Sequence, residues 1–432
     1  MQTEHSRGSM NMIQEKLNLQ DKYATYAVDI FLLYTFYYDL WDKALHNYLR
    51  TILFIISLFF IFFSLYTKDK HILIKKSFMK YIIGWSMFFS LFFLFRNRWI
   101  ENHFYWRAIR ILWSLLIIFC LSKSINRFTN LYKRLVIIGY PHVIATILLF
   151  LFRNTYSVMY RFWGYYPDGT GGGKYGFRAG LTGHYSRNGI MISIVFLCCF
   201  AYSYYYRLKK EKSYFPVNLL TFISFLSLLL TMKRAHILFS LFIIAVIIFL
   251  FQQQLSIEKI IRGIVFTSVL TALFLLLYNN VPEMKILLSR FQKIGEDSSS
   301  VARFNMWKAA LSLFESNPII GVGWGAFRYL TAYNVEAHNV YIELLAETGI
   351  TGFVIYTTCL YNTLKILFIV LKRSFSQIDK NVFVISVASF EICLFYAIYS
   401  LTGNCLYDIT FDFFVFPIAS AYFLQYEPSF QW

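Results

Sequence analysis

Charged residues are scarce in this chain, and their scarcity excludes most soluble folds. Only 15% of its 432 residues are Asp, Glu, Lys or Arg, whereas 58% are hydrophobic. Apolar runs of about 17 to 20 residues recur along the sequence, and each is long enough to cross roughly 30 Å of hydrocarbon as a helix. The composition therefore predicts an all-α polytopic membrane protein.

The chain also lacks the residue patterns of common cofactor and metal sites. Its six cysteines show neither zinc-type spacing nor a disulfide framework. The glycine-rich PDGTGGGKYG (167–176) lacks the Gly-Lys-Ser/Thr ending of a phosphate-binding loop. The expected outer loops carry no DxD or HxxH motif, and Asp408 and Asp412, at helical spacing, are only a weak metal signal. We predict chemistry that needs no metal and no other cofactor.

Acidic residues are outnumbered by basic ones, which gives a formal net charge of +18. The basic residues gather between apolar runs, where such residues usually set topology and contact lipid headgroups, so we predict no nucleic-acid partner. With the N-terminus in the cytoplasm, the connections TKDKHILIKKS, RLKKEKS and LKRSFSQIDKN all fall inside, as the positive-inside rule requires.

About twelve membrane-spanning helices are expected, although Asp39 and Asp42 weaken the prediction for the first, near 25–40. No charged segment followed by an apolar stretch opens the chain, so we expect the first span to direct insertion without a cleavable signal peptide. The predicted parts are a cytoplasmic tail with a tag-like HSRGSM (1–24), N-terminal spans (25–152), an extracytoplasmic loop (153–185), spans with a hairpin at Arg234 (186–278), a large extracytoplasmic loop (279–338) and C-terminal spans (339–432).

Several arginines fall on the outer side, against the positive-inside rule. For Arg96 and Arg98, contact with outer-leaflet phosphates is a sufficient reason. Arg234 is harder to dismiss, because TMKRAH places it in a tight outer hairpin between two apolar runs. The other candidates, in or beside the long loops, are Arg178, Arg187, Arg290 and Arg303.

A cluster of outward-facing arginines suits a lipid-linked diphosphate, whose charge lies at the headgroup level. Charge-assisted contacts from guanidinium groups contribute roughly 1.5 to 3 kcal/mol each. If the diphosphate is also the leaving group, the arginines stabilise charge that develops in the transition state. A sugar hydroxyl that attacks the anomeric carbon then needs a base. His338 is our candidate, with a helix cap or a structural role as the alternative.

A polar stripe follows His338 directly. Asn339, Glu343 and Glu347 recur at i, i+4 and i+8, so they share one face of the expected helix. We predict that they bind substrate or orient a histidine; the alternative is that they cap the helix or pair with basic residues inside the bundle. The glycines of TGITG, after Glu347, predict a kink or close helix packing.

Two segments resemble the signature of a known family, the O-antigen ligase and Wzy-type polymerase superfamily. They are RFNMWKAALSLFESNPIIGVGWGAF (303–327) and AHNVYIELLAETGITGF (337–353), and TMKRAH and FRAGLTGHYSRNG stand where the family has its other outer-face motifs. The resemblance covers roughly residues 175–370. It implies an inverting, metal-independent glycosyltransferase of the GT-C type that uses an undecaprenyl-diphosphate-linked oligosaccharide outside the bacterial cytoplasmic membrane.

By motif position, the resemblance implies that Arg234 and Arg303 hold the donor's pyrophosphate and that His338 activates or positions the acceptor hydroxyl. Arg187 is implied as a third cation, and Arg178 is a further candidate for substrate binding. The family commonly has Ser-Arg where this chain has Lys233-Arg234.

The acceptor distinguishes two activities within this family. A polymerase uses a second lipid-linked repeat unit and a ligase uses a lipid A-core sugar. We favour the polymerase, and Arg107, Arg110 and Arg178 would support it if they lined a second anion site. Its expected partners are the glycan substrates, membrane lipids and a chain-length regulator. A transporter would have a similar number of helices, but the chain shows no internal repeat.

Overall fold

The computed structural model describes residues 2–39, 48–65, 84–85, 88, 102–121, 128, 130–152, 176–209, 214–251, 285, 289, 292, 298–377 and 379–425. The elements in these ranges are all helical, which confirms the predicted all-α class for this part of the chain. They are α1 (Gln2–Phe36), α3 (Tyr48–Leu65), α5 (Asn102–Leu121), α7 (Leu131–Leu151), η2 (Gly176–Ala179), α9 (Tyr185–Lys209), α10 (Tyr214–Leu230), α11 (Arg234–Phe251), α14 (Ser298–Ser316), α15 (Ala326–Leu330), α16 (Val340–Gln377), α17 (Lys380–Tyr399) and α18 (Thr410–Gln425).

Helices long and apolar enough to cross a membrane are α7, α9, α16 and α17 among the described elements. Shorter apolar helices lie in α3, α5, α10, α11 and α18. The chain is therefore a multi-pass membrane protein. Two of the expected membrane-spanning helices correspond to apolar runs near 77–95 and 258–278, which lie wholly or mostly outside the described residues. Helix α1 continues through the boundary predicted after residue 24.

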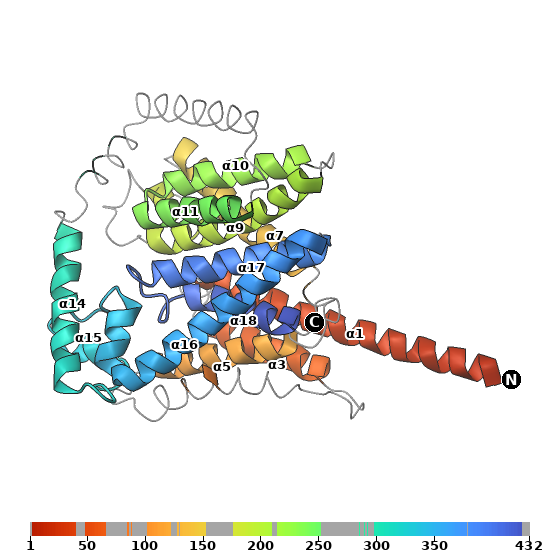
Figure 1. Ribbon diagram of the computed structural model, residues 1–432, viewed down its shortest axis with the longest axis horizontal. Helices are drawn as coiled ribbons and strands as arrows, with labels where there is room; N and C mark the ends of the chain where they lie inside the picture. The colour runs from red at the N-terminus through yellow and green to blue at the C-terminus, as the bar shows by residue number, and fades with distance from the viewer. Residues whose placement is uncertain are drawn as a thin grey trace.

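The long helices run side by side, while α14 stands across one end of the bundle and α1 projects from the other (Figure 1). The centre of the bundle is formed by α9 and α17, since 78% of the apolar window of each is buried, against 33% for α7 and 39% for α16. In hydrocarbon a helix satisfies its own backbone polar groups, so the outer helices can face lipid.

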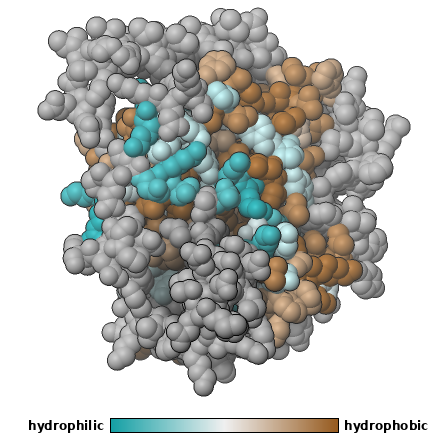
Figure 2. All heavy atoms as spheres, turned by 90° about the vertical axis from the view of Figure 1, so that its right-hand side faces the viewer, coloured by the Kyte–Doolittle hydropathy of each residue, from teal (hydrophilic) through white to brown (hydrophobic). Residues whose placement is uncertain are grey.

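The end from which α1 projects shows hydrophilic side chains gathered in its middle and bordered by hydrophobic ones (Figure 2). Here Lys380, at the start of α17, donates a 2.7 Å hydrogen bond to Tyr206 near the end of α9. The last turn of α9 also carries Arg207 and Lys209. We refer to this end as the basic end; the end crossed by α14 lies opposite.

The helix α16 is broken at Gly349, whose φ of 64° lies in the left-handed region. This break confirms the kink predicted from TGITG. The segment 317–325 packs into it so closely that a Cβ at Gly321 would lie 2.3 Å from a backbone atom of Glu347. Backbone hydrogen bonds join the two segments from Val322 to Ala346, from Gly323 to Glu347, from Ile350 to Pro318 and from Thr351 to Ile319. The break thus anchors the segment that leads to His338.

Candidate active site

The predicted hairpin is present, because α10 ends at Leu230 and α11 begins at Arg234. Its turn contains Met232 with φ 54°, a conformation that costs a non-glycine residue on the order of 1 kcal/mol or more. The carbonyl of Thr231 accepts a 3.2 Å hydrogen bond from the Arg178 Nε–H, and Arg178 is itself buried. Arg178 therefore stabilises the backbone of the hairpin turn.

The ring of Tyr185, the first residue of α9, contacts two cations. The Arg178 guanidinium lies 4.4 Å from its centroid and the Lys233 ammonium 4.2 Å. Such cation–π contacts contribute about 0.5 to 2 kcal/mol each. Tyr185 thereby fixes the position of Lys233 and joins the hairpin to the start of α9.

Two hydrogen bonds hold the backbone of Ala337, next to His338. Trp307, one turn after Arg303 on α14, donates a 2.9 Å hydrogen bond from Nε1 to the carbonyl of Ala337. The N–H of Ala337 donates to Glu343 Oε2 at 3.0 Å. His338 follows with φ 56°, which a bulky residue adopts only when its surroundings impose it.

The polar stripe of α16 supports the loop that carries His338. The side chain of Asn339 accepts from the N–H groups of Tyr341 at 3.1 Å and Ile342 at 3.2 Å, which is the geometry of a helix N-cap. Its side chain is buried, as is that of Glu343. Asn339 thus caps the helix, which was the alternative to substrate binding. Glu343 orients the backbone next to His338.

Glu347 holds a second point of the same loop. Its carboxylate accepts a 3.1 Å hydrogen bond from the N–H of Phe327 and another from the hydroxyl of Tyr407. The side chain is fully buried. Glu347 therefore joins α16 to α15 and to the segment before α18.

A cavity of about 1040 Å³ opens between these parts of the chain. Among the described residues, its wall combines cations with three histidines and two acids, Glu336 and Asp408. The cations are Arg110, Arg187, Lys233, Arg234, Arg303 and Arg328, and the histidines are His184, His236 and His338. Such a wall suits an anionic ligand.

Helix starts add to this positive charge. The wall includes Tyr185 and Arg234, the first residues of α9 and α11, and His338 and Asp408, each two residues before the start of α16 or α18. The N-terminus of a helix carries a partial positive charge and unpaired N–H groups. The N-terminus of α18 uses one such group itself, since the Thr410 N–H donates to Asp408 at 2.7 Å.

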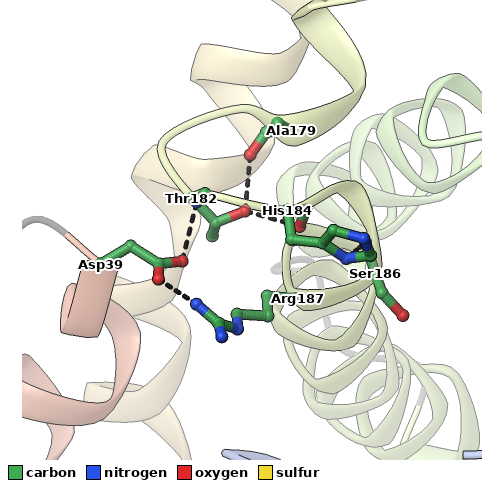
Figure 3. Close-up of polar contacts among 7 residues, drawn as sticks. Asp39, Ala179, Thr182, His184, Ser186 and Arg187 are labelled. Carbon is green, nitrogen blue, oxygen red and sulfur yellow. Dashed lines mark hydrogen bonds and ion pairs between the residues drawn. The ribbon is translucent and has the colours of Figure 1, made fainter. Parts of the chain in front are cut away.

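Arg187 lies in the wall with its charge already paired. Figure 3 shows Asp39 reaching across to the Arg187 guanidinium and to the turn before α9. The same carboxylate accepts a 2.7 Å hydrogen bond from the N–H of Gly183, and Tyr38 places its ring 5.7 Å from the guanidinium. Arg187 remains 41% exposed, so it can still reach a ligand.

Arg110 is paired as well. Its Nε lies 3.2 Å from Asp412, and its NH2 group donates to the carbonyls of Tyr407 and Asp408. Asp412 is therefore the partner of an arginine. Arg110 lies in the cavity wall and Arg178 lies outside it, so these two arginines do not lie together at one site. The side chain of Arg107 is outside the described residues.

Burial, together with the nearby positive charges of Arg303 and Lys233, lowers the pKa of His338 to about 4, while Glu336 opposes them. The imidazole is thus unprotonated at neutral pH and can accept a proton. Burial raises the pKa of Asp408, against the opposing effects of Thr410 and the arginines.

Of the predicted site residues, the cavity brings together Arg187, Arg234, Arg303 and His338. It does not include Arg178, Asn339, Glu343 or Glu347, which support its wall. Arg290 is outside the described residues.

The sequence interpretation missed the roles of Asp39, Arg328 and Glu336. Arg328 and Glu336 lie in the wall, 3.9 Å apart. Of these three residues, Asp39 alone carried a signal in the sequence, because a carboxylate at the end of an apolar run indicates a charged partner.

The part of the chain that supplies Lys233, Arg234, Arg303 and His338 to the cavity wall matches a known family model. Residues 219–357 match the O-antigen ligase family model. The match covers about a third of the chain and includes Arg234, Arg303 and His338. It supports the O-antigen ligase and polymerase superfamily that the sequence resembles. No curated protein matches the chain.

Proposed function

We propose that this protein is an inverting, metal-independent glycosyltransferase that polymerises undecaprenyl-diphosphate-linked oligosaccharide repeat units at the outer face of the bacterial cytoplasmic membrane. One observation carries the proposal. Arg234 on α11, Arg303 on α14 and His338 before α16 meet in the wall of one cavity, although they come from separate segments.

The reaction is a displacement at the anomeric carbon of the donor sugar. The acceptor hydroxyl gives its proton to His338 while its oxygen forms the new glycosidic bond. The bond from the anomeric carbon to the diphosphate breaks, and its electron pair leaves with the diphosphate oxygen. Attack from the face opposite the leaving group inverts the anomeric centre.

The cations act on the leaving group. Negative charge grows on the diphosphate as the bond breaks, so Arg234, Arg303 and Lys233 bind it more strongly in the transition state than in the ground state. Arg187 is a further cation for the same group, positioned by Asp39.

The arrangement of charge supports an extracytoplasmic site. Basic residues on α9 and α17 gather at the end of the bundle opposite α14. By the positive-inside rule that end is cytoplasmic, and the cavity beside α14 then opens on the outer side. A donor held there keeps its lipid tail in the membrane and its sugar outside.

A ligase is the second candidate, because the matching family model is described as O-antigen ligase. The two activities share the donor and the cavity but use different acceptors. For the polymerase, we also propose a chain-length regulator as a protein partner.

Reconstitution of the purified protein with undecaprenyl-diphosphate repeat units in EDTA tests the proposal. A ladder of longer lipid-linked chains on a gel is the expected result. Transfer only after lipid A-core is added would establish the ligase instead. No transfer to either acceptor would contradict the glycosyltransferase.

A further inference from the structure

Two histidines of the cavity wall, His184 and His236, are not used by the proposed reaction, and the second of them is buried. His236 lies in the first turn of α11, two residues after Arg234, and belongs to the cavity wall. It is only 1% exposed, and neither ring nitrogen has a hydrogen-bond partner among the described residues.

The protein packs closely around this ring. The centroid of Tyr399 lies 4.6 Å from that of His236, and the ring of Phe395 stacks at 6.0 Å. On α9, a Cβ at Gly189 would lie 3.0 Å from His236 Nδ1, so a side chain there would crowd the imidazole. Glycine thus leaves room for the ring at the inner edge of the cavity.

Such packing alone does not explain a histidine. A buried polar group without a partner is destabilising, whereas a phenylalanine would make the same aromatic contacts at no such cost. An imidazole in this place is explained if a ligand completes its hydrogen bonding.

The surroundings of His236 define the ligand as an anion. The ring lies at the N-terminus of an 18-residue helix, next to the cations Lys233 and Arg234. An imidazole N–H in this position donates to a negatively charged oxygen, and a phosphoryl group supplies several such oxygens.

We infer that His236 donates a hydrogen bond to a phosphoryl oxygen of the lipid diphosphate, on the membrane side of Arg234. The inference rests on the proposed function and adds a binding residue to it. Because α11 continues from Arg234 into the bundle, His236 reaches the phosphate nearer the lipid tail while Arg234 and Arg303 reach the outer part of the diphosphate.

Binding of undecaprenyl diphosphate to the purified, detergent-solubilised full chain tests this role without catalysis. His236→Phe keeps the aromatic packing and removes the N–H, so we expect about tenfold weaker binding or more. His236→Gln restores a side-chain N–H and should recover most of the affinity. The matched control is His142→Phe: His142 is buried beside the rings of Phe36 and Tyr37 and outside the cavity wall, and its loss should leave binding unchanged.

Wild-type affinity in His236→Phe would overturn the inference and leave the proposed function intact. Equal weakening by His142→Phe and His236→Phe would also overturn it, since the effect would then come from general loss of packing. If the wild-type protein itself did not bind the diphosphate, the proposed function would fail with it. Should His236→Phe not fold, His236→Gln and His236→Ala carry the same comparison, with only the first expected to bind well.

Discussion

The cavity has two cationic walls that are built in different ways. The hairpin wall presents Lys233 from a turn of three residues between two helices and Arg234 from the start of the second helix. The loop wall presents Arg303 and His338 from α14 and the long segment before α16. A short turn needs little support, whereas the long segment is fixed by carboxylates inside the bundle.

The difference explains why an apolar chain keeps two glutamates on one membrane helix. Glu343 and Glu347 accept hydrogen bonds from backbone N–H groups of the loop wall and do not reach the cavity. The hairpin wall receives its support from a cation, Arg178, which donates to a backbone carbonyl. In both walls, the charged residues that line the cavity thus differ from the charged residues that support it.

The largest expected effect belongs to His338 on the loop wall. His338→Ala should lower sugar transfer by about 10²- to 10⁴-fold, because it removes the proton acceptor. Its elution from a sizing column and its thermal unfolding should match the wild-type protein. Transfer within a few fold of wild type would remove His338 from the mechanism.

Loss of one cation from either wall should be the next largest effect. Arg234→Ala and Arg303→Ala should each weaken transfer by roughly 10- to 100-fold, from about 1.5 to 3 kcal/mol per charged contact. Initial rates of transfer at several donor concentrations measure the loss in each variant. Arg207→Ala, an exposed arginine at the basic end, is the control and should have no effect. Equal losses in all three variants would contradict a localised anion site.

Removal of the Glu347 carboxylate, which supports the loop wall, should lower the thermal stability of the protein. Glu347→Ala leaves the Phe327 N–H and the Tyr407 hydroxyl without their acceptor, which costs about 1 to 3 kcal/mol for each buried donor. Thermal unfolding in detergent should show a lower midpoint than in Glu315→Ala, an exposed position on α14. An unchanged midpoint would mean that Glu347 does not hold the loop.

The pH dependence of transfer tests the electrostatic environment of His338 in the loop wall. Because the folded pKa of His338 is about 4, kcat/KM should fall only as the pH drops through that region, well below the ordinary value of about 6.5. Arg303 is one cause of this low pKa, so Arg303→Ala should raise it and move the acidic limb to higher pH. A wild-type limb near 6.5 would contradict the buried, neutral imidazole.

The smallest expected effect is on the hairpin wall. Arg178→Met loses the hydrogen bond to Thr231 and the cation beside Tyr185 but keeps most of the side-chain volume. We expect a roughly three- to tenfold rise in the donor KM with little change in kcat. A loss as large as that of Arg234→Ala would indicate that Arg178 itself binds the diphosphate.

Local patterns were enough to predict much of the fold. Apolar runs in the sequence coincide with α7, α9 and α17, and the short polar interval at Lys233 predicted the hairpin. The glycines after Glu347 indicated the break in α16. These features depend on neighbouring residues, which is why a single sequence reveals them.

The partners of the polar residues could not be predicted in the same way. Asp39 meets Arg187 from 148 positions away, and Glu347 meets Tyr407 across 60. Asn339 caps α16 and Glu343 and Glu347 lie within it, but which loop the two glutamates contact depends on how α14 and α16 pack. Helical periodicity sets the face of a residue and leaves its distant partner undetermined.

The central claim is that the cavity binds a lipid diphosphate and that His338 then takes the acceptor's proton. The most direct test measures both steps in one pair of proteins, wild type and His338→Ala. We predict that both bind undecaprenyl diphosphate and that only the wild type extends lipid-linked repeat units in EDTA. Transfer by the variant, or loss of diphosphate binding in the folded variant, would contradict the separation of the binding cations from the catalytic histidine.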